Sequence, residues 1–172
     1  YSKLLVKKSI NRLKGRNIFG VVEHKVLPGS SDDLKVLEIF IEEKATGELM
    51  AGAGIGTDGT SFQFAVKENN WLGRGIKLKS ELNLSEDKIS GNISVRNPNY
   101  NYSGNSVLAA LDVSSTDRSS TTGFSSSRTG VTLGTTFEQY ENIYFSPEIN
   151  TEWEDIETDA TASAQIKKME GN

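Results

Sequence analysis

The chain has 172 residues, of which 35% are hydrophobic and 24% charged, and its formal net charge is −4. This length allows one domain, or one domain and part of another. The absence of cysteine excludes a disulfide scaffold and any thiolate metal site. No apolar run approaches the roughly 20 residues of a membrane-spanning helix. A β-barrel membrane protein is left open, because barrel strands are not continuously apolar.

Basic residues are concentrated at the N-terminus. Residues 1–30 carry seven Lys or Arg against one Glu, a balance of +6, whereas the remainder has a balance of −10. Most of these basic residues fall on one short predicted helix, without the interleaved aromatic residues of a nucleic-acid-binding face. We therefore interpret the excess as the solvated face of a helix and expect no nucleic-acid partner.

The first 44 residues have the pattern of a small α/β unit. Apolar residues recur at helical spacing over residues 2–14, and Ser2 is a candidate N-cap. Two strands are predicted at 21–27 and 34–42, with a Pro/Gly/Ser/Asp turn cluster between them. A segment of about 40 residues is too small to fold well alone. We therefore expect it to be the end of a larger α/β unit.

From residue 47 onward, apolar residues recur at period two in one segment after another. The segments are 49–56, 62–67, 76–84, 89–96, 107–113, 131–138, 143–154 and, more weakly, 162–167. One set of alternating positions carries no charged side chain, while the other set carries at least ten. Because side chains alternate across a strand, these segments predict an antiparallel sheet with one apolar face and one polar face.

The connectors between these segments differ at the two ends of the predicted sheet. Connectors far from the N-terminal unit are rich in Ser, Thr, Asp and Glu; they are residues 57–60, 85–88, 114–127 and 155–160. Connectors near that unit carry aromatic residues typical of a membrane-interface girdle. These residues are Trp71, Tyr100, Tyr102 and Tyr140. The pattern favours a membrane barrel, and a soluble β domain is the alternative.

No residues point to an enzyme. His24 is the only histidine, so no second imidazole or thiolate exists to share a metal. The segment Gly52-Ala-Gly-Ile-Gly56 lies inside a strand pattern, whereas a phosphate-binding loop must open a helix. We interpret it as a glycine-rich strand that is open to close approach of another backbone. We expect no catalytic residue, no cofactor and no metal.

Five short segments, in this order, resemble a known family. Leu13-Lys-Gly-Arg-Asn-Ile-Phe-Gly-Val-Val22 resembles the last POTRA domain of BamA-type outer-membrane assembly factors. Glu42-Glu-Lys-Ala-Thr-Gly47 is similar to the hinge of that family, and Gly52-Ala-Gly54 to the opening of its first barrel strand. Asn70-Trp-Leu-Gly-Arg-Gly75 and Arg96-Asn-Pro-Asn-Tyr100 resemble its first two periplasmic turns.

The resemblance implies a mostly β protein. Residues 1–44 would form the C-terminal part of a POTRA domain in the periplasm. Residues 45–172 would form about eight antiparallel, up-and-down transmembrane strands, the N-terminal portion of a β-barrel in the bacterial outer membrane. The implied function is the assembly and insertion of β-barrel proteins into that membrane. The implied partners are unfolded outer-membrane protein clients, outer-membrane lipid and accessory lipoproteins.

Other classes remain open at this point. One is another member of the same superfamily, such as a TamA-like or two-partner-secretion transporter, which the number of upstream POTRA units would distinguish. A second is a passive β-barrel, which would have no α/β unit before its first strand. A third is a soluble β binding domain, which would not require detergent.

The resemblance also implies three groups of site residues. The first barrel strand would act as a lateral gate that pairs with a client strand through its backbone, with residues Leu49, Ala51, Gly52, Ala53, Gly54, Ile55 and Gly56. The hinge would comprise Glu43, Thr46 and Gly47. The periplasmic turns and aromatic girdle would comprise Asn70, Trp71, Gly73, Gly75, Pro98, Tyr100, Tyr102 and Tyr140.

Overall fold

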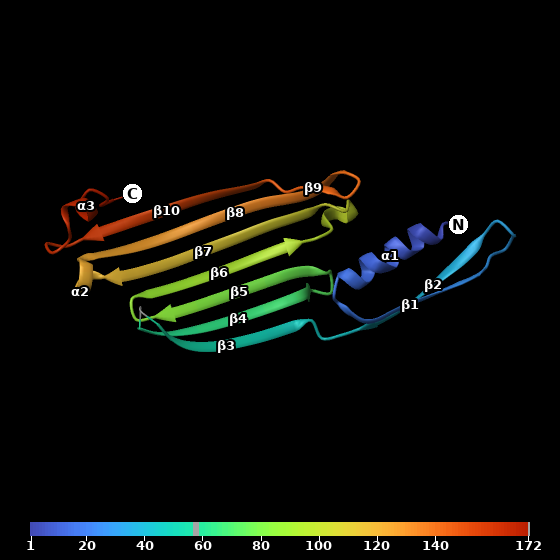
Figure 1. Cartoon of the computed structure of the whole chain (residues 1–172), viewed down its shortest axis with the longest axis horizontal. Coiled ribbons are helices and arrows are strands. Elements are labelled where there is room, and N and C mark those ends of the chain that lie inside the picture. The colour runs from blue at the N-terminus through green and yellow to red at the C-terminus, as the bar shows by residue number, and fades with distance from the viewer. Residues whose placement is uncertain (57–58, 172) are drawn as a thin grey trace.

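The computed structural model describes residues 1–56 and 59–171. It consists of a two-stranded sheet with one helix, followed by a sheet of eight strands, all pairs being antiparallel (Figure 1). We call the end of the large sheet that faces the N-terminal unit the junction end, and the opposite end the far end. The predicted fold class, a mostly β protein with up-and-down antiparallel strands, is confirmed.

The N-terminal unit forms as its sequence pattern predicts. Helix α1 (Lys3–Gly15) begins at the N-cap Ser2, whose Oγ accepts a hydrogen bond from the backbone N–H of Leu5 at 3.4 Å. The helix packs on β1 (Phe19–Pro28), which pairs with β2 (Lys35–Glu43). A small core between them buries Ile10, Ile18 and Val22. Within the described residues, every helix is too short or too polar to cross a membrane.

The large sheet is a meander in which each long strand pairs with the next long strand in the chain. Its long strands are β3 (Gly47–Gly56), β4 (Gly59–Trp71), β5 (Ile76–Ser85), β6 (Lys88–Asn97), β7 (Ser106–Arg118), β8 (Phe124–Tyr140) and β10 (Glu148–Thr158). The short β9 (Ile143–Phe145) pairs with the end of β8. Strands β3 and β10 form the two edges, and both edges are open within the described residues.

The strand register brings the alternating apolar positions onto one face. In the middle of the sheet, Ile93 lies opposite Leu111, and Leu111 lies opposite Val131. Towards the β3 edge, Phe64 lies opposite Leu82 in the same way. Directly opposed residues of antiparallel strands share a face. The predicted apolar face is therefore continuous across all the long strands.

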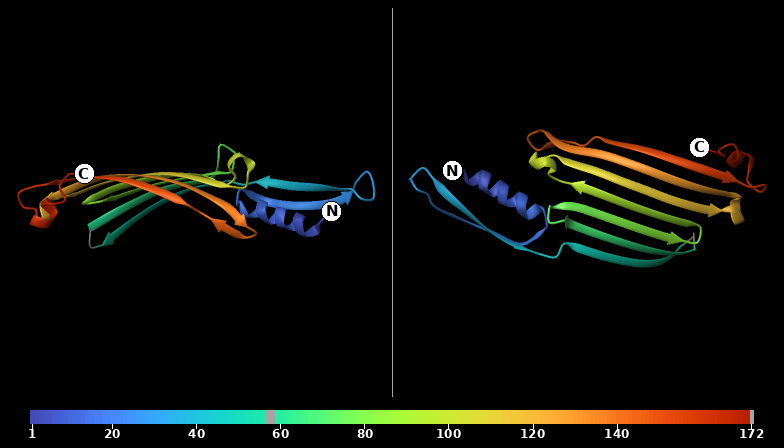
Figure 2. Two further views of the ribbon diagram at one scale, coloured as in Figure 1. Left: turned by 90° about the horizontal axis from the view of Figure 1, so that it is seen from above. Right: turned by 180° about the vertical axis from the view of Figure 1, so that it is seen from behind.

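No described residue forms a second layer of protein against this face. Figure 2 shows the large sheet as a single curved layer. Many of its large apolar side chains are exposed; Ile149, for example, is 73% exposed and Leu133 58%. In a soluble domain, a contiguous apolar surface of this extent marks a site of interaction with a membrane or another protein. In a membrane barrel, such a surface faces lipid.

The opposite face carries hydrogen-bonded polar side chains. The Asn92 Nδ2 donates to Asp112 Oδ1 at 2.7 Å, and Arg128 pairs with Glu152. These side chains line a hollow of about 320 Å³. The polar network is the one expected for a barrel wall that faces an aqueous lumen.

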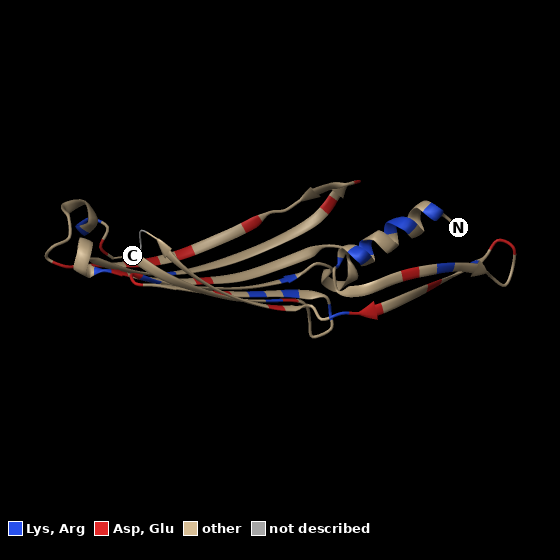
Figure 3. Ribbon diagram, turned by 60° about the horizontal axis from the view of Figure 1, so that its bottom comes forward, with Lys and Arg blue, Asp and Glu red and all other residues tan. Residues whose placement is uncertain are grey.

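Charged residues of the apolar set occur only near the strand ends, within the described part of the chain. Glu68 lies at the junction end of β4, and Asp117, Asp155 and Glu157 lie at the far end. Figure 3 shows Lys and Arg repeated along α1 and charged residues at intervals along the strands of the large sheet; those in mid-strand, such as Glu81 and Asp112, belong to the polar set. The middle of the apolar face is therefore free of charge, as a lipid-facing band requires.

Two predicted connectors at the far end, 114–127 and 155–160, are wrong in their bounds. In the second, β10 continues to Thr158 and pairs with β8. The Ser/Thr-rich segment 114–127 was expected to be a long loop, but β7 and β8 continue through it and pair residue by residue, for example Thr116 with Ser126. Only helix α2 (Ser119–Thr122) and Gly123 lie between these strands. Hydroxyl side chains occur in strands as well as in loops, so the composition of 114–127 did not distinguish a strand from a loop. The connector 57–60 is described only at residues 59 and 60, which belong to β4.

The end of the chain also differs from the prediction. The weak strand expected at 162–167 is instead helix α3 (Ala164–Lys167), because the Ser163 hydroxyl accepts from the Ile166 N–H and caps a helical turn. The strand expected at 143–154 is divided at Pro147 into β9 and β10. Proline has no N–H to donate to a strand ladder, which accounts for the interruption.

A compact loop cluster closes the far end. Gly123 has φ +75°, and its carbonyl accepts from the Asp159 N–H at 2.9 Å. The Asp159 carboxylate accepts from the hydroxyl and the N–H of Thr161, and these bonds lower the pKa of Asp159. Ala162 is buried beside them. The loop after β10 is thus anchored to the turn between β7 and β8.

Gly123→Ala is expected to lower the free energy of unfolding by about 3 kcal/mol. The new Cβ would lie 2.5 Å from the Ala162 backbone nitrogen, and the left-handed backbone adds strain. The control is Gly104→Ala, where φ is +81° but no atom lies within 4 Å, so only the strain of about 1–2 kcal/mol remains. Urea unfolding of the full-length protein in detergent micelles measures both. Equal losses would contradict the steric argument.

Candidate strand-docking edge and hinge

Strand β3 is an open edge of the large sheet. It pairs with β4 on one side, and no described residue pairs with its other side. All ten of its residues are exposed, with Leu49 at 84% and Ile55 at 90%. The residues predicted for the gate strand therefore lie together on a free strand edge, and their role as a gate stays a prediction.

The register defines which residues turn their backbone groups outward. The Asn69 N–H donates to the Thr46 carbonyl at 3.4 Å, at the start of the β3–β4 pair, where Gly47 lies opposite Glu68. In an antiparallel pair, residues that bond to the partner strand alternate with residues that do not. Thr46 and the even-numbered residues of β3 therefore direct their backbone N–H and C=O groups to β4. The odd-numbered residues direct their N–H and C=O groups to the open edge; they are Gly47, Leu49, Ala51, Ala53 and Ile55.

Glycines leave the polar side of β3 bare. A Cβ added at Gly52 or Gly56 would meet no atom within 4 Å, and at Gly54 it would meet only the Ser61 hydroxyl at 3.4 Å. Few side-chain contacts thus hold this strand to its neighbour on that face. Backbone hydrogen bonds provide most of its attachment, which suits a strand that exchanges partners.

The three predicted hinge residues lie on both sides of a short link between the two sheets. Glu43 ends β2, and Thr46 leads into Gly47, the first residue of β3. The intervening Lys44 donates from its backbone N–H to Ile18 O at 3.4 Å, and its Nζ donates to the side chain of Asn17. The link is therefore tied to the α/β unit.

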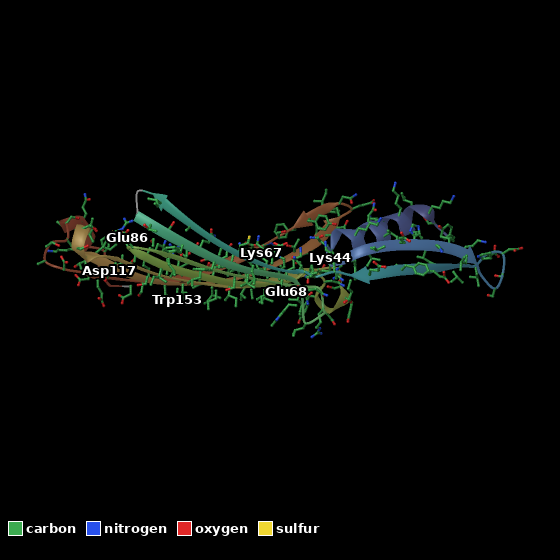
Figure 4. All side chains as sticks on the ribbon, turned by 90° about the horizontal axis from the view of Figure 1, so that it is seen from below. Lys44, Lys67, Glu68, Glu86, Asp117 and Trp153 are labelled. Carbon is green, nitrogen blue, oxygen red and sulfur yellow. The ribbon has the colours of Figure 1, made fainter. Side chains whose placement is uncertain are left out.

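Thr46 is tied to the large sheet. Its hydroxyl donates to the Glu68 carboxylate, which also accepts from the Asn70 N–H at 2.7 Å. The side-chain amide of Asn69 (Nδ2) also donates to the Thr46 carbonyl, at 3.3 Å. Figure 4 shows Glu68 and Lys44 at the junction end, and Glu86 and Asp117 at the far end. Glu68 thus holds the start of β3 against β4, a role that the sequence pattern did not reveal.

The first turn at the junction end is built on Asn70. The Asn70 side chain accepts from Gly75 N at 2.7 Å, and its carbonyl accepts from Gly73 N at 2.8 Å. Both glycines have positive φ, +67° at Gly73 and +66° at Gly75, which favours glycine at these positions. The guanidinium of Arg16 lies 3.5 Å from the position of a Cβ on Gly75. The turn therefore contacts the end of α1.

The predicted girdle aromatics all lie at this same end. Trp71 ends β4, Tyr100 and Tyr102 lie in the 3₁₀ turn η1 (Tyr100–Tyr102) after Pro98, and Tyr140 ends β8. Tyr102 is 92% exposed. A membrane-interface role for these residues stays a prediction. Their common location follows from the meander, which returns every second connector to one end.

Helix α1 makes ionic contacts with the β8–β9 hairpin. Arg12 lies 3.8 Å from Glu138, and Lys8 lies 3.8 Å from Glu141. The basic face of α1 was interpreted only as solvated, so its position against the large sheet is an additional finding. Both pairs are substantially exposed, and such pairs contribute little to stability, about 0–1 kcal/mol each.

The chemistry of this region is that of backbone pairing and apolar contact. Over residues 1–56 and 59–171, no group of three or more His, Asp or Glu side chains could hold a metal ion. No polar or charged residue among them is buried. What the edge offers a ligand is a row of unpaired backbone donors and acceptors next to an apolar face.

Glu68→Ala is expected to accelerate amide hydrogen exchange at Asn70 and over residues 44–47 by about tenfold. The substitution removes the acceptor for Thr46 and Asn70, and a hydrogen bond to a charged group contributes about 1.5–3 kcal/mol. Glu86→Ala is the control, because Glu86 accepts a similar bond from the Thr60 N–H (3.3 Å) at the far end. Exchange that is equally fast in both variants would contradict a specific role for Glu68 at the hinge.

These features together define a class of protein. The large sheet is a curved, single-layer meander with one charge-free apolar band, and a small α/β unit precedes it in the chain. Such a sheet is part of an outer-membrane-type β-barrel. The model of the Omp85 superfamily domain matches residues 70–171. The chain belongs to the Omp85 superfamily, a family of outer-membrane β-barrel proteins.

A solved structure supports the same fold. The chain is similar to the crystal structure of BamA from Haemophilus ducreyi lacking POTRA domains 1–3, with a TM-score of 0.70 and 21% identity. The match covers 89% of this chain and 30% of that one, so the chain spans about a third of the length of the BamA structure. The predicted resemblance to BamA-type proteins is confirmed.

Proposed function

We propose that this chain is part of a factor that assembles β-barrel proteins into the bacterial outer membrane, and that β3 is the strand with which a client pairs. The observation that carries the proposal is the open, glycine-rich edge of β3 in a sheet whose apolar face is suited to lipid. Residues 1–44 are proposed to be the C-terminal part of a periplasmic POTRA domain. Residues 45–172 are proposed to be the N-terminal portion of the barrel.

The proposed mechanism is strand addition. In the hydrocarbon region of a membrane, each unsatisfied backbone N–H or C=O costs several kcal/mol. An unfolded client strand that pairs with the outward groups of β3 satisfies its own groups and those of the edge together. Burial of the apolar side chains of the client in lipid provides further free energy. Neither a nucleotide nor a metal is required.

The other site residues are proposed to support this step from the periplasmic side. The hinge residues Glu43, Thr46 and Gly47 would hold the POTRA part beside the start of β3. The junction-end aromatics would sit at the membrane interface and fix the depth of the strands. Outer-membrane lipid and accessory lipoproteins are the proposed further partners.

Reconstitution tests this function. The full-length protein that contains this chain is placed in liposomes, and a urea-unfolded eight-stranded outer-membrane barrel protein is added. We expect the client to become protease-resistant and membrane-inserted much faster than in empty liposomes. A passive pore or a binding domain would give no acceleration. A secretion transporter would instead move its substrate into the liposome lumen, and either result would reject the proposal.

A further inference from the structure

We infer that the junction end of the large sheet holds a binding site for the phosphate headgroup of a membrane phospholipid, with Arg16 and Arg74 as its anion-binding residues. Arg16 follows helix α1, and Arg74 lies in the turn between β4 and β5, so the site joins the α/β unit to the large sheet. Such a site binds lipid rather than a client strand, and its existence does not depend on the proposed function.

The site is a cavity of about 500 Å³ where the two units meet. Arg16 lines it from the α/β unit, and Arg74 lines it from the large sheet, together with other residues of the turns 70–75 and 97–102. Arg16 is half-buried, and its guanidinium carbon lies 3.5 Å from the position that a Cβ on Gly75 would take. The Arg16 guanidinium therefore lies beside the turn that carries Arg74.

Both arginines have their guanidinium groups free for a ligand. Among the described residues, neither group has an ion-pair or hydrogen-bond partner. In contrast, each of the other arginines has a side-chain partner; they are Arg12, Arg96, Arg118 and Arg128. A guanidinium presents its donors in a planar fork that matches the oxygens of a phosphate. Two unpaired forks in one cavity are therefore available to an anion.

Asparagine side chains of the same cavity add further donors. Each side-chain oxygen accepts a backbone N–H of its own turn: Asn70 from Gly75 at 2.7 Å, Asn97 from Asn99 at 3.1 Å, and Asn99 from Gly104 at 2.8 Å. Because a backbone N–H can only donate, these bonds assign the oxygen and leave each amide NH2 group as a donor. Within the described part of the chain, these NH2 groups have no partner. They favour an anionic ligand, as the arginines do.

The charge of the cavity matches a phosphate diester. Glu43 is the acidic side chain among the lining residues, and it forms no ion pair with either arginine. Two positive charges and one negative charge give the lining a formal charge of +1. A phosphate diester, the group that links the headgroup of a phospholipid to its glycerol, carries a single negative charge.

The position of the cavity favours a lipid over a soluble phosphate. It lies at the junction end, where the charge-free apolar band of the sheet ends. The same turns carry exposed side chains suited to a membrane interface, with Leu72 at 69% and Tyr102 at 92%. Figure 4 shows these turns on the same side of the sheet as Trp153, which is aligned with the apolar positions of the neighbouring strands. The tails of a phospholipid bound here would lie along the apolar face, with its phosphate at the arginines.

Native mass spectrometry of the full-length protein, freed of lipid in detergent, tests this site. The probes are dioctanoyl phosphatidylglycerol, inorganic phosphate, and dioctanoylglycerol, which has the same tails without a phosphate. We expect the wild type to bind the phospholipid at least about tenfold more tightly than dioctanoylglycerol, because each 1.4 kcal/mol of added interaction is about tenfold in affinity. Arg16→Gln/Arg74→Gln should lose this preference, because it removes the charge-assisted hydrogen bonds to the phosphate.

The matched control is Lys14→Gln/Lys77→Gln, which removes two positive charges near the junction end from residues that do not line the cavity. It should keep the preference within about twofold of the wild type. The lipid site is ruled out if the wild type shows no preference, if Arg16→Gln/Arg74→Gln keeps it, or if both double variants lose it equally. Inorganic phosphate that binds as tightly as the phospholipid would also rule out a lipid ligand.

Each variant is first checked for a folded barrel by the difference in gel mobility between unheated and heated samples. If the double arginine variant does not fold, Arg74→Gln is measured alone, because Arg74 lies on an exposed turn. We expect this single variant to lower the preference for the phospholipid by at least about threefold, since one of the two forks remains. An unchanged preference in a folded Arg74→Gln variant would contradict the site.

Discussion

Replacing Ala53 with proline is expected to slow client assembly strongly while the barrel remains folded. The Ala53 N–H points to the open edge, so proline removes a donor that a client strand needs but none that β4 needs. Proline is tolerated in edge strands when its missing N–H faces outward. We expect assembly in liposomes to slow by more than tenfold. The difference in gel mobility between unheated and heated samples, which reports a folded barrel, should be unchanged. Assembly at the wild-type rate would exclude pairing at this residue.

Gly54→Pro is the matched comparison for this prediction. Gly54 is the next residue along β3 and lies opposite Ser61, and its N–H belongs to the set that bonds to β4. Proline there removes a ladder bond and is expected to destabilise the barrel by about 3 kcal/mol. Equal thermal stabilities of the Ala53→Pro and Gly54→Pro variants would contradict the assignment of outward and inward residues.

Leu111→Arg is expected to lower the free energy of unfolding of the full-length protein in liposomes by about 2–4 kcal/mol. Leu111 lies near the middle of β7, between Ile93 and Val131 on the apolar face, and is 42% exposed. An arginine there would be placed near the mid-plane of the hydrocarbon. The denaturation midpoint in guanidinium measures the loss, provided that the slope of the transition is unchanged.

Ala110→Arg, one residue away, is the control because it points to the polar face. Ala110 lies between Ser94 and Thr132, near other hydrogen-bonding side chains. We expect its effect to be within about 0.5 kcal/mol, as for a solvated surface substitution. If the two substitutions lower the free energy of unfolding equally, the assignment of the apolar face to lipid is wrong. If Ala110→Arg is the more harmful, the faces are reversed.

Much of the fold was predictable because strand alternation is a local property. The apolar positions of β5 and β6 repeat every second residue, and the register places them on one face without exception. The N-cap of α1 at Ser2 was equally local. In contrast, the extension of β7 and β8 through the Ser/Thr-rich segment 114–127 depends on pairing between the two strands. Composition alone suggested a loop there.

The candidate site was predictable in position but not in detail. The glycine pattern of residues 52–56 identified a strand open to another backbone. Its place at the edge of the sheet depends on the order of all the strands. Glu68 was not predicted, because its bond to the Thr46 hydroxyl joins residues that are 22 positions apart. The contact between Arg12 and Glu138 spans a still longer separation.

The sequence by itself determined the strand alternation and the two faces of the sheet, because each follows from the identity of neighbouring residues. Only the tertiary structure decided which β3 residues point outward, because that depends on the hydrogen bond between Asn69 and Thr46. It also decided that Phe62 lies opposite Ala53 and Phe64 opposite Ala51. Register is a relation between strands, and a one-residue shift would exchange the inward and outward sets.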